Sequence, residues 1–185
     1  MLNVRRQRGD TIVEAVIAFA VFGAVAVGAM VVMNRGVAMA QRSLEVTLVR
    51  EQIDAQADML RYIRDNGGNA WDELISNINT SPQPISSDMA SCPTPSSPSF
   101  FLTGAAGTVP AVKSATYAGN FITPVTYALV DHNTKKSSNI WIETTRAQGS
   151  GASVKAYDFR IHACWQSVGG DNPVTLGTIV RLYAK

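Results

Sequence analysis

Four polar side chains alternate along one segment near the C-terminus, "VKAYDFRIHACWQS": Asp158, Arg160, His162 and Cys164. A thiol close to a histidine and a carboxylate is a combination that nucleophilic catalysis uses. The residues between them are apolar or aromatic, however, and this period of two predicts a β-strand with one apolar face. Alternate residues on the outer face of a strand are usually just polar and have no catalytic role, and a disulfide at Cys164 would remove the nucleophile. We therefore expect no enzymatic activity.

Other motifs for catalysis, cofactors and metals are missing from the sequence. The chain has no G-x-G-x-x-G, no P-loop, no H-E-x-x-H and no C-x-x-C, and "GSG" at residues 149–151 is not a nucleophile elbow. His132 and His162 are thirty residues apart, which is not a typical zinc-ligand spacing. The sequence predicts neither a cofactor nor a metal.

The charges of the chain are unevenly distributed. A net charge of +2 over 185 residues gives no reason to expect nucleic acid as a direct partner. The charged fraction is 16%, below the roughly 25% of globular domains, and residues 15–33 contribute no charge. As a helix, this segment would cover about 28 Å, close to the ~30 Å hydrocarbon core of a bilayer. We expect a helix over residues 10–33 that spans a membrane.

Arginines on both sides of the apolar segment bear on its orientation. Arg5, Arg6 and Arg8 precede it, and positive residues close to a span are retained on the cytoplasmic side. Arg35 and Arg42 follow it and weaken this asymmetry. We expect a cytoplasmic N-terminus, with the rest of the chain on the outside, where disulfides form and persist.

The chain contains two cysteines, Cys92 and Cys164. Cys92 lies in "SPQPISSDMASCPTPSSPSF", a proline- and serine-rich segment that is unusually long for a compact domain unless something tethers it. A bond between the cysteines would close a loop of about 72 residues and contribute on the order of 4 kcal/mol. Two free buried thiols are the alternative, because a sequence does not show which cysteines are close in space.

The predicted helix continues as an amphipathic half over residues 34–66. At 100° per residue its charges gather in one sector, and the apolar residues form an arc of about half the circumference. Such an arc is wider than one docking surface needs. It can serve two surfaces, one against its own domain and one against a neighbour, but a single wide core face is the alternative that the helix pattern alone favours. Gly67 and Gly68 end the helix. The charged sector is Arg50, Glu51, Asp54, Asp58, Arg61 and Asp65, and the apolar arc is Val37, Leu44, Leu48, Val49, Ile53, Met59, Leu60, Tyr62 and Ile63.

The remaining chain divides into an irregular segment and a sheet. Residues 67–122 are expected to be irregular, apart from a short helix at 70–78. Residues 123–185 contain candidate strands joined by short turn-forming links, which predicts an antiparallel meander. The predicted fold class is α+β, a long N-terminal helix packed on a C-terminal antiparallel sheet of about four strands. The candidate strands are 123–131, 139–147, 154–167 and 174–183.

One acid, Glu14, stands at the start of the apolar segment, where a carboxylate is expensive to bury. "TIVE", from Thr11 to Glu14, matches a capping box, which would suit any helix that begins there. A second feature is the basic leader "RRQRG", which ends in Gly9 and stands five residues before the glutamate. Leader, glycine, glutamate and apolar span together resemble the class III signal of the type IV pilin family. This family comprises major and minor pilins and the pseudopilins of type II secretion and competence systems.

The resemblance implies how the chain is processed and what it does. Residues 1–9 would be a leader that prepilin peptidase removes by cutting between Gly9 and Asp10, followed by methylation of the new N-terminus. Glu14 would pair with the freed amine of Asp10 in a neighbouring subunit and so help to set the assembly register. The implied protein is a structural subunit of a type IV pilus-like filament, first a single-pass membrane protein and then part of the cell surface. Its implied partners are the membrane, the peptidase, other pilin subunits and the inner-membrane assembly platform.

Two residues depart from the family pattern, and other functions are compatible with the sequence. Asp10 stands where the family usually has phenylalanine, and Val31 where it commonly has proline. A pseudopilin of a secretion or competence system would share all of the features above. "AMA" at residues 38–40 resembles a signal-peptidase site, and cleavage after Ala40 would release a soluble domain that starts at Gln41. An uncleaved membrane-anchored protein with a ligand-binding or enzymatic ectodomain is the third alternative.

Overall fold

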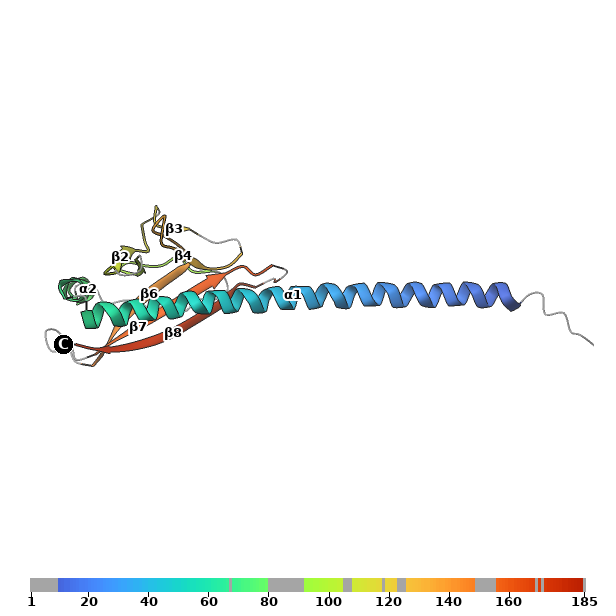
Figure 1. Cartoon of the computed structure of the whole chain (residues 1–185), viewed down its shortest axis with the longest axis horizontal. Helices are drawn as coiled ribbons and strands as arrows, with labels where there is room; N and C mark the ends of the chain where they lie inside the picture. Colours follow the sequence, from blue (N-terminus) through green and yellow to red (C-terminus); the bar gives the residue numbers. More distant parts are fainter. Residues whose placement is uncertain are drawn as a thin grey trace, which may run out of the picture. The chain divides into compact units, whose positions relative to one another are not determined.

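A computed structural model describes residues 10–66, 68–79, 92–104, 108–117, 119–122, 126–148, 156–168, 170 and 172–184. Figure 1 shows the order of the elements along the chain. They are α1 (Asp10–Asn66), α2 (Asn69–Asn79), β1 (Phe100–Thr103), β2 (Ala111–Ser114), β3 (Phe121–Ile122), β4 (Leu129–Asp131), β5 (Lys136–Ser138), β6 (Ile140–Gln148), β7 (Ala156–Trp165) and β8 (Val174–Tyr183).

Helix α1 contributes to two compact units of the chain, Met1–Gln41 and Arg42–Lys185. It is 57 residues long. Its sequence has no proline, which would remove a backbone hydrogen bond inside a helix. Just past its end, Gly68 has a φ of 48°, in the left-handed region that glycine adopts readily where a helix stops. The short predicted helix that follows is confirmed as α2.

The main sheet belongs to the second unit and has the strand order β2-β1-β6-β7-β8. Every neighbouring pair is antiparallel. β7 pairs with β8 along its whole length, from Ala156 opposite Tyr183 to Trp165 opposite Val174. Its register with β6 shifts once, between Arg146 and Gln148. The α+β class and three of the predicted strands are therefore confirmed.

The expected irregular segment, residues 67–122, contains strands. β1 and β2 pair with each other, and β1 also meets β6 at Phe100 opposite Ile142. Each has four residues, too few for a period of two to be recognised next to prolines and serines. The prediction of irregular structure is wrong here because these short strands are stabilised by pairing with each other and, at Phe100, with β6.

The predicted strand at 123–131 does not join the main sheet. Its described part contains β4, which pairs with β5 in a separate sheet of order β3-β5-β4. β3 and β5 run parallel in this sheet. Residues 123–125 lie outside the described residues. The prediction of a four-stranded meander is thus wrong in its first strand, because strands of two or three residues pair wherever a neighbouring backbone is available.

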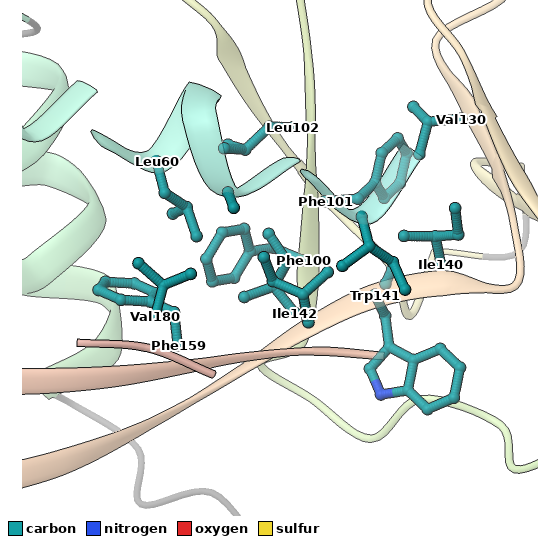
Figure 2. Close-up of a cluster of buried hydrophobic side chains, with 14 of the residues drawn as sticks. Leu60, Phe100, Phe101, Leu102, Val130, Ile140, Trp141, Ile142, Phe159 and Val180 are labelled. Carbon is teal, nitrogen blue, oxygen red and sulfur yellow. The ribbon is translucent and has the colours of Figure 1, made fainter. Parts of the chain in front are cut away.

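The hydrophobic core of the second unit lies between the C-terminal half of α1 and the main sheet. Val49, Ile53, Leu60 and Ile63 are buried on the helix. Figure 2 shows Leu60 beside Phe100, Ile142, Phe159 and Val180, with Trp141 on the opposite side of its strand. This alternation along β6 follows from the pleat of a strand, which directs successive side chains to opposite faces.

Two glutamines of α1 also bind the strands directly. Gln56 is 1% exposed, and its side chain donates to the carbonyl oxygen of Leu102 (2.9 Å) and accepts from the Leu102 amide (2.8 Å). Gln52 Oε1 accepts from the amide of Val130 at 3.2 Å. Helix α1 therefore supplies hydrogen-bond partners to β1 and β4, which the charge pattern on its surface does not predict.

Replacing Gln56 by leucine is expected to lower the free energy of unfolding by about 2–4 kcal/mol, because a buried amide and a buried carbonyl of β1 both lose their partner. Denaturant unfolding of the full chain in detergent measures the loss. The matched control is Gln52→Leu, which removes a single hydrogen bond and should cost about 1 kcal/mol. Equal effects of the two substitutions would contradict the assignment of Gln56 as the stronger anchor.

Candidate assembly surface

The N-terminal part of α1 exposes its apolar side chains on all sides. No side chain from Thr11 to Leu44 is buried. Phe19 and Phe22, for example, are 77% and 72% exposed. An 18-residue window of this helix has a mean hydropathy of 2.6, and the helix is long and apolar enough to cross a membrane. An apolar surface of this size requires cover from lipid or protein, because exposed apolar area is unfavourable in water.

Glu14 is exposed in the second turn of α1 and is the only charged residue between Thr11 and Asn34. α1 begins at Asp10, which leaves Thr11 inside the helix and not at the N-cap position of the capping box. Asp10 and Glu14 are four residues apart and share one helix face. Gly9 and the side chain of Asp10 lie outside the described residues. The position of Glu14 near the helix N-terminus favours its negative charge.

The apolar arc of the amphipathic half is buried along one side and exposed along the other. Val49, Ile53, Leu60 and Ile63 form the buried surface described above. Val37, Leu44, Leu48 and Tyr62 are between 36% and 60% exposed. The residues of the charged sector are all exposed, and Arg61 pairs with Asp58 at 2.6 Å. The half of α1 that holds the sheet thus keeps a second apolar surface free within the described structure.

Cys92 and Cys164 form the predicted disulfide, with their Cα atoms 5.5 Å apart. Cys164 is fully buried in β7, on the strand face opposite Phe159 and Ile161. The bond attaches the segment before β1 to the C-terminal end of β7. It also removes the only thiol of the polar cluster on β7, so that this cluster has no cysteine nucleophile.

The other polar residues on this face of β7, Asp158, Arg160 and His162, are half-buried. His162 is half-buried and stacks on Trp141 of β6, with 5.4 Å between ring centroids. Its Nε2 lies 3.5 Å from Oε2 of Glu143, whose side chain is fully buried and whose Oε1 accepts from Trp141 Nε1 at 2.9 Å. These polar positions of β7 are therefore packed against their neighbours, and Glu143 is a buried acid that the alternation of residues does not reveal.

This arrangement is a packed network with little room for a substrate. A pocket of about 110 Å³ adjoins His162 and is lined by Trp141, Ala163, Thr175, Leu176 and Gly177. Gly177 allows close approach of β8 to β7, because a Cβ there would lie 2.9 Å from the carbonyl oxygen of Ile161. Among the residues that the structure describes, no group of three His, Cys, Asp or Glu side chains is placed to hold a metal ion.

Asp158 and Arg181 form an ion pair with two hydrogen bonds, Nε to Oδ1 at 2.7 Å and Nη2 to Oδ2 at 2.8 Å. The hydrogen bond from Arg181 is the main cause that lowers the pKa of Asp158 below its ordinary value. A lowered carboxyl pKa adds stability above the pKa of the unfolded chain, and this stability is lost as the pH falls through the folded value. Asp158→Asn should therefore weaken the acid dependence of the unfolding midpoint, measured between pH 7 and pH 3. An unchanged pH profile would contradict this contribution.

Comparisons with protein-family models, with curated proteins and with solved structures find no significant match for this chain. The architecture is nevertheless pilin-like. It has a long N-terminal apolar helix, an antiparallel sheet against which the helix packs, and a disulfide in the C-terminal part.

Proposed function

We propose that this protein is a structural subunit, a pilin or minor pilin, of a type IV pilus-like filament. The observation that carries the proposal is the fully exposed apolar surface of α1 from Thr11 to Leu44, in which Glu14 is the only acid. A membrane would cover this surface before assembly, and the helices of other subunits would cover it afterwards. The sheet and its disulfide would form a head outside the membrane.

Glu14 has a defined role in this proposal. Prepilin peptidase would cut after Gly9, and the amine of Asp10 in a neighbouring subunit would then compensate the carboxylate in the filament core. A carboxylate without such a partner is costly in an apolar environment. This pairing favours an axial offset between neighbouring subunits and therefore contributes to their register. The inner-membrane assembly platform would be a further partner, and the function would be non-catalytic.

A pseudopilin of a type II secretion or competence system would use the same helix in the same way. Two features favour a surface-displayed subunit over it. They are the disulfide and the proline- and serine-rich sequence around Cys92, which are features of a surface-displayed head more than of a subunit that only packs against its neighbours.

A soluble secreted domain is the second candidate, because one observation favours it. The compact second unit begins at Arg42, one residue after the Gln41 that cleavage behind Ala40 would expose. The sequence Ala38–Ala40 lies inside α1 in the structure. In this case residues 1–40 would serve only as a signal, and the exposed apolar surface would be absent from the mature protein.

The intact mass and N-terminal sequence of the protein from its native membrane or surface fraction test these proposals. We expect a chain that starts at Asp10, with or without an added methyl group. A start at Gln41 would replace the filament proposal by the secreted domain. A start at Met1 would contradict both and leave a membrane-anchored protein.

A further inference from the structure

From Thr11 onward, Glu45 is the first side chain of α1 that is buried, at 9% exposure. Its neighbours along the helix are less buried. Arg42, Ser43, Leu44, Thr47 and Leu48 are exposed, and Val46 is half-buried. Between Arg42 and Leu48, α1 is therefore held to the rest of the second unit by this carboxylate and by Val46, which packs against the hydrophobic core.

Both hydrogen bonds of this carboxylate end on one oxygen atom. Trp165 Nε1 donates to Glu45 Oε2 at 3.1 Å, and Ser167 Oγ donates to the same oxygen at 2.6 Å. Trp165 is the last residue of β7, and Ser167 lies two residues further along the chain. Both side chains are buried, Trp165 completely and Ser167 to 4% exposure. Removal of the acceptor would leave two buried donors without this partner, which is unfavourable.

Glu45, Gln52 and Gln56 lie on one face of α1, because seven and eleven residues correspond to nearly whole numbers of turns. Gln52 and Gln56 hold β4 and β1, as described above. From Val49 onward, buried apolar residues recur along this part of the helix and add to these anchors. The contacts after residue 48 thus do not involve Glu45, whereas from Arg42 to Leu48 Glu45 is joined in the interior only by the half-buried Val46.

We propose that Glu45 is a latch that fixes the point from which α1 is held on the sheet. When the latch opens, residues 42–48 separate from the end of β7, while residues 53–63 stay docked through their own contacts. Glu45 acts here as a hydrogen-bond acceptor, because one oxygen receives both donors. This inference concerns the second unit alone and does not depend on the filament proposal.

The test compares four full-length proteins in detergent micelles: the wild type, Glu45→Leu, Glu45→Gln and Glu51→Leu. Hydrogen exchange of the amides of residues 43–48 and of 53–63 is measured, together with exchange of the Trp165 indole N–H. Glu51→Leu is the matched control, because Glu51 is an exposed acid on the same helix.

In Glu45→Leu, we expect exchange of residues 43–48 and of the Trp165 indole to rise about tenfold or more, the effect of losing one or two hydrogen bonds to a charged group. Residues 53–63 should exchange as in the wild type. Glu45→Gln should resemble the wild type, because the amide oxygen can accept both donors. The control should also resemble the wild type.

Three results would overturn the latch. One is wild-type exchange at residues 43–48 in Glu45→Leu. Another is an equal rise over residues 53–63, since it would show a general loss of stability. The last is a Glu45→Gln protein that behaves like Glu45→Leu, since it would show that the charge is required. If Glu45→Leu does not fold, Ser167→Ala takes its place, because it removes one of the two donors to Glu45 and leaves α1 unchanged. It should raise exchange at residues 43–48 and leave residues 53–63 as in the wild type, and wild-type exchange at residues 43–48 would overturn the latch.

Discussion

Glu14→Ala is expected to lower incorporation of the protein into filaments at least about a hundredfold. Under the proposed function, each subunit places the amine of Asp10 next to Glu14 of a neighbour in an apolar environment. Loss of one member of a buried ion pair costs about 3–5 kcal/mol, because the remaining charge has no partner. Even the lower value corresponds to a factor of more than about 100 for each contact. The amount of protein in sheared surface filaments, relative to the amount in the membrane, measures the effect.

The matched control for this experiment is Glu51→Ala, which removes an acid from the exposed charged sector of α1. It should leave incorporation within about twofold of the wild type, because an exposed charge contributes little. The N-terminus of the Glu14 variant must also be determined, since a processing defect would lower incorporation for another reason. Normal filaments from a correctly processed Glu14→Ala chain would exclude the role of this carboxylate in assembly.

Replacement of both cysteines by alanine is expected to destabilise the second unit by about 4 kcal/mol. The disulfide closes a loop of 72 residues, and its absence enlarges the conformational freedom of the unfolded chain. Part of the effect arises in the folded state, because Cys164 is fully buried and the smaller alanine leaves unfilled space. Unfolding in urea, followed by the fluorescence of the tryptophans, measures the difference.

Reduction of the wild-type protein provides the control for the cysteine substitutions. The reduced protein keeps both side chains and loses only the bond, so its midpoint should fall nearly as far as that of the double variant. Free energies of unfolding of the oxidised wild type and the double variant that agree within about 0.5 kcal/mol would contradict a stabilising role. The two predictions are also separable, since Glu14→Ala should not change the unfolding midpoint of the second unit.

The candidate assembly surface could be predicted largely from the sequence. An uncharged run of helical length with one acid at its start is a local feature, and residues 11–44 form an exposed apolar helix in the structure. The glycine before that acid lies outside the described residues. The bounds of α1 follow from an absence of proline and from the glycine pair at 67–68. Strands β6, β7 and β8 were predictable for a similar reason, because nine or ten residues display a period of two.

The disulfide could be suggested from the sequence, but only the tertiary structure shows that the two cysteines are close enough to form it. The sequence suggested the bond because Cys92 lies in a long proline- and serine-rich segment that would need a tether, but two free thiols remained an alternative. The folded chain places Cys92 and Cys164 with their Cα atoms 5.5 Å apart, although 72 residues separate them. Proximity of that kind is a property of the packed chain and is not encoded in the spacing of two residues.

By itself, the sequence determined the long helix, its exposed apolar half with Glu14, and the long central strands, since each depends on neighbours within a few positions in the chain. Only the tertiary structure decided the short strands β1 to β5 and the buried polar contacts of Glu45, Gln56 and Glu143. The physical reason is that a strand of two to four residues is stable only through its partner strand. A buried polar side chain likewise requires a hydrogen-bonding group, and for Gln56 and Glu45 that group lies 46 to 122 residues away along the chain.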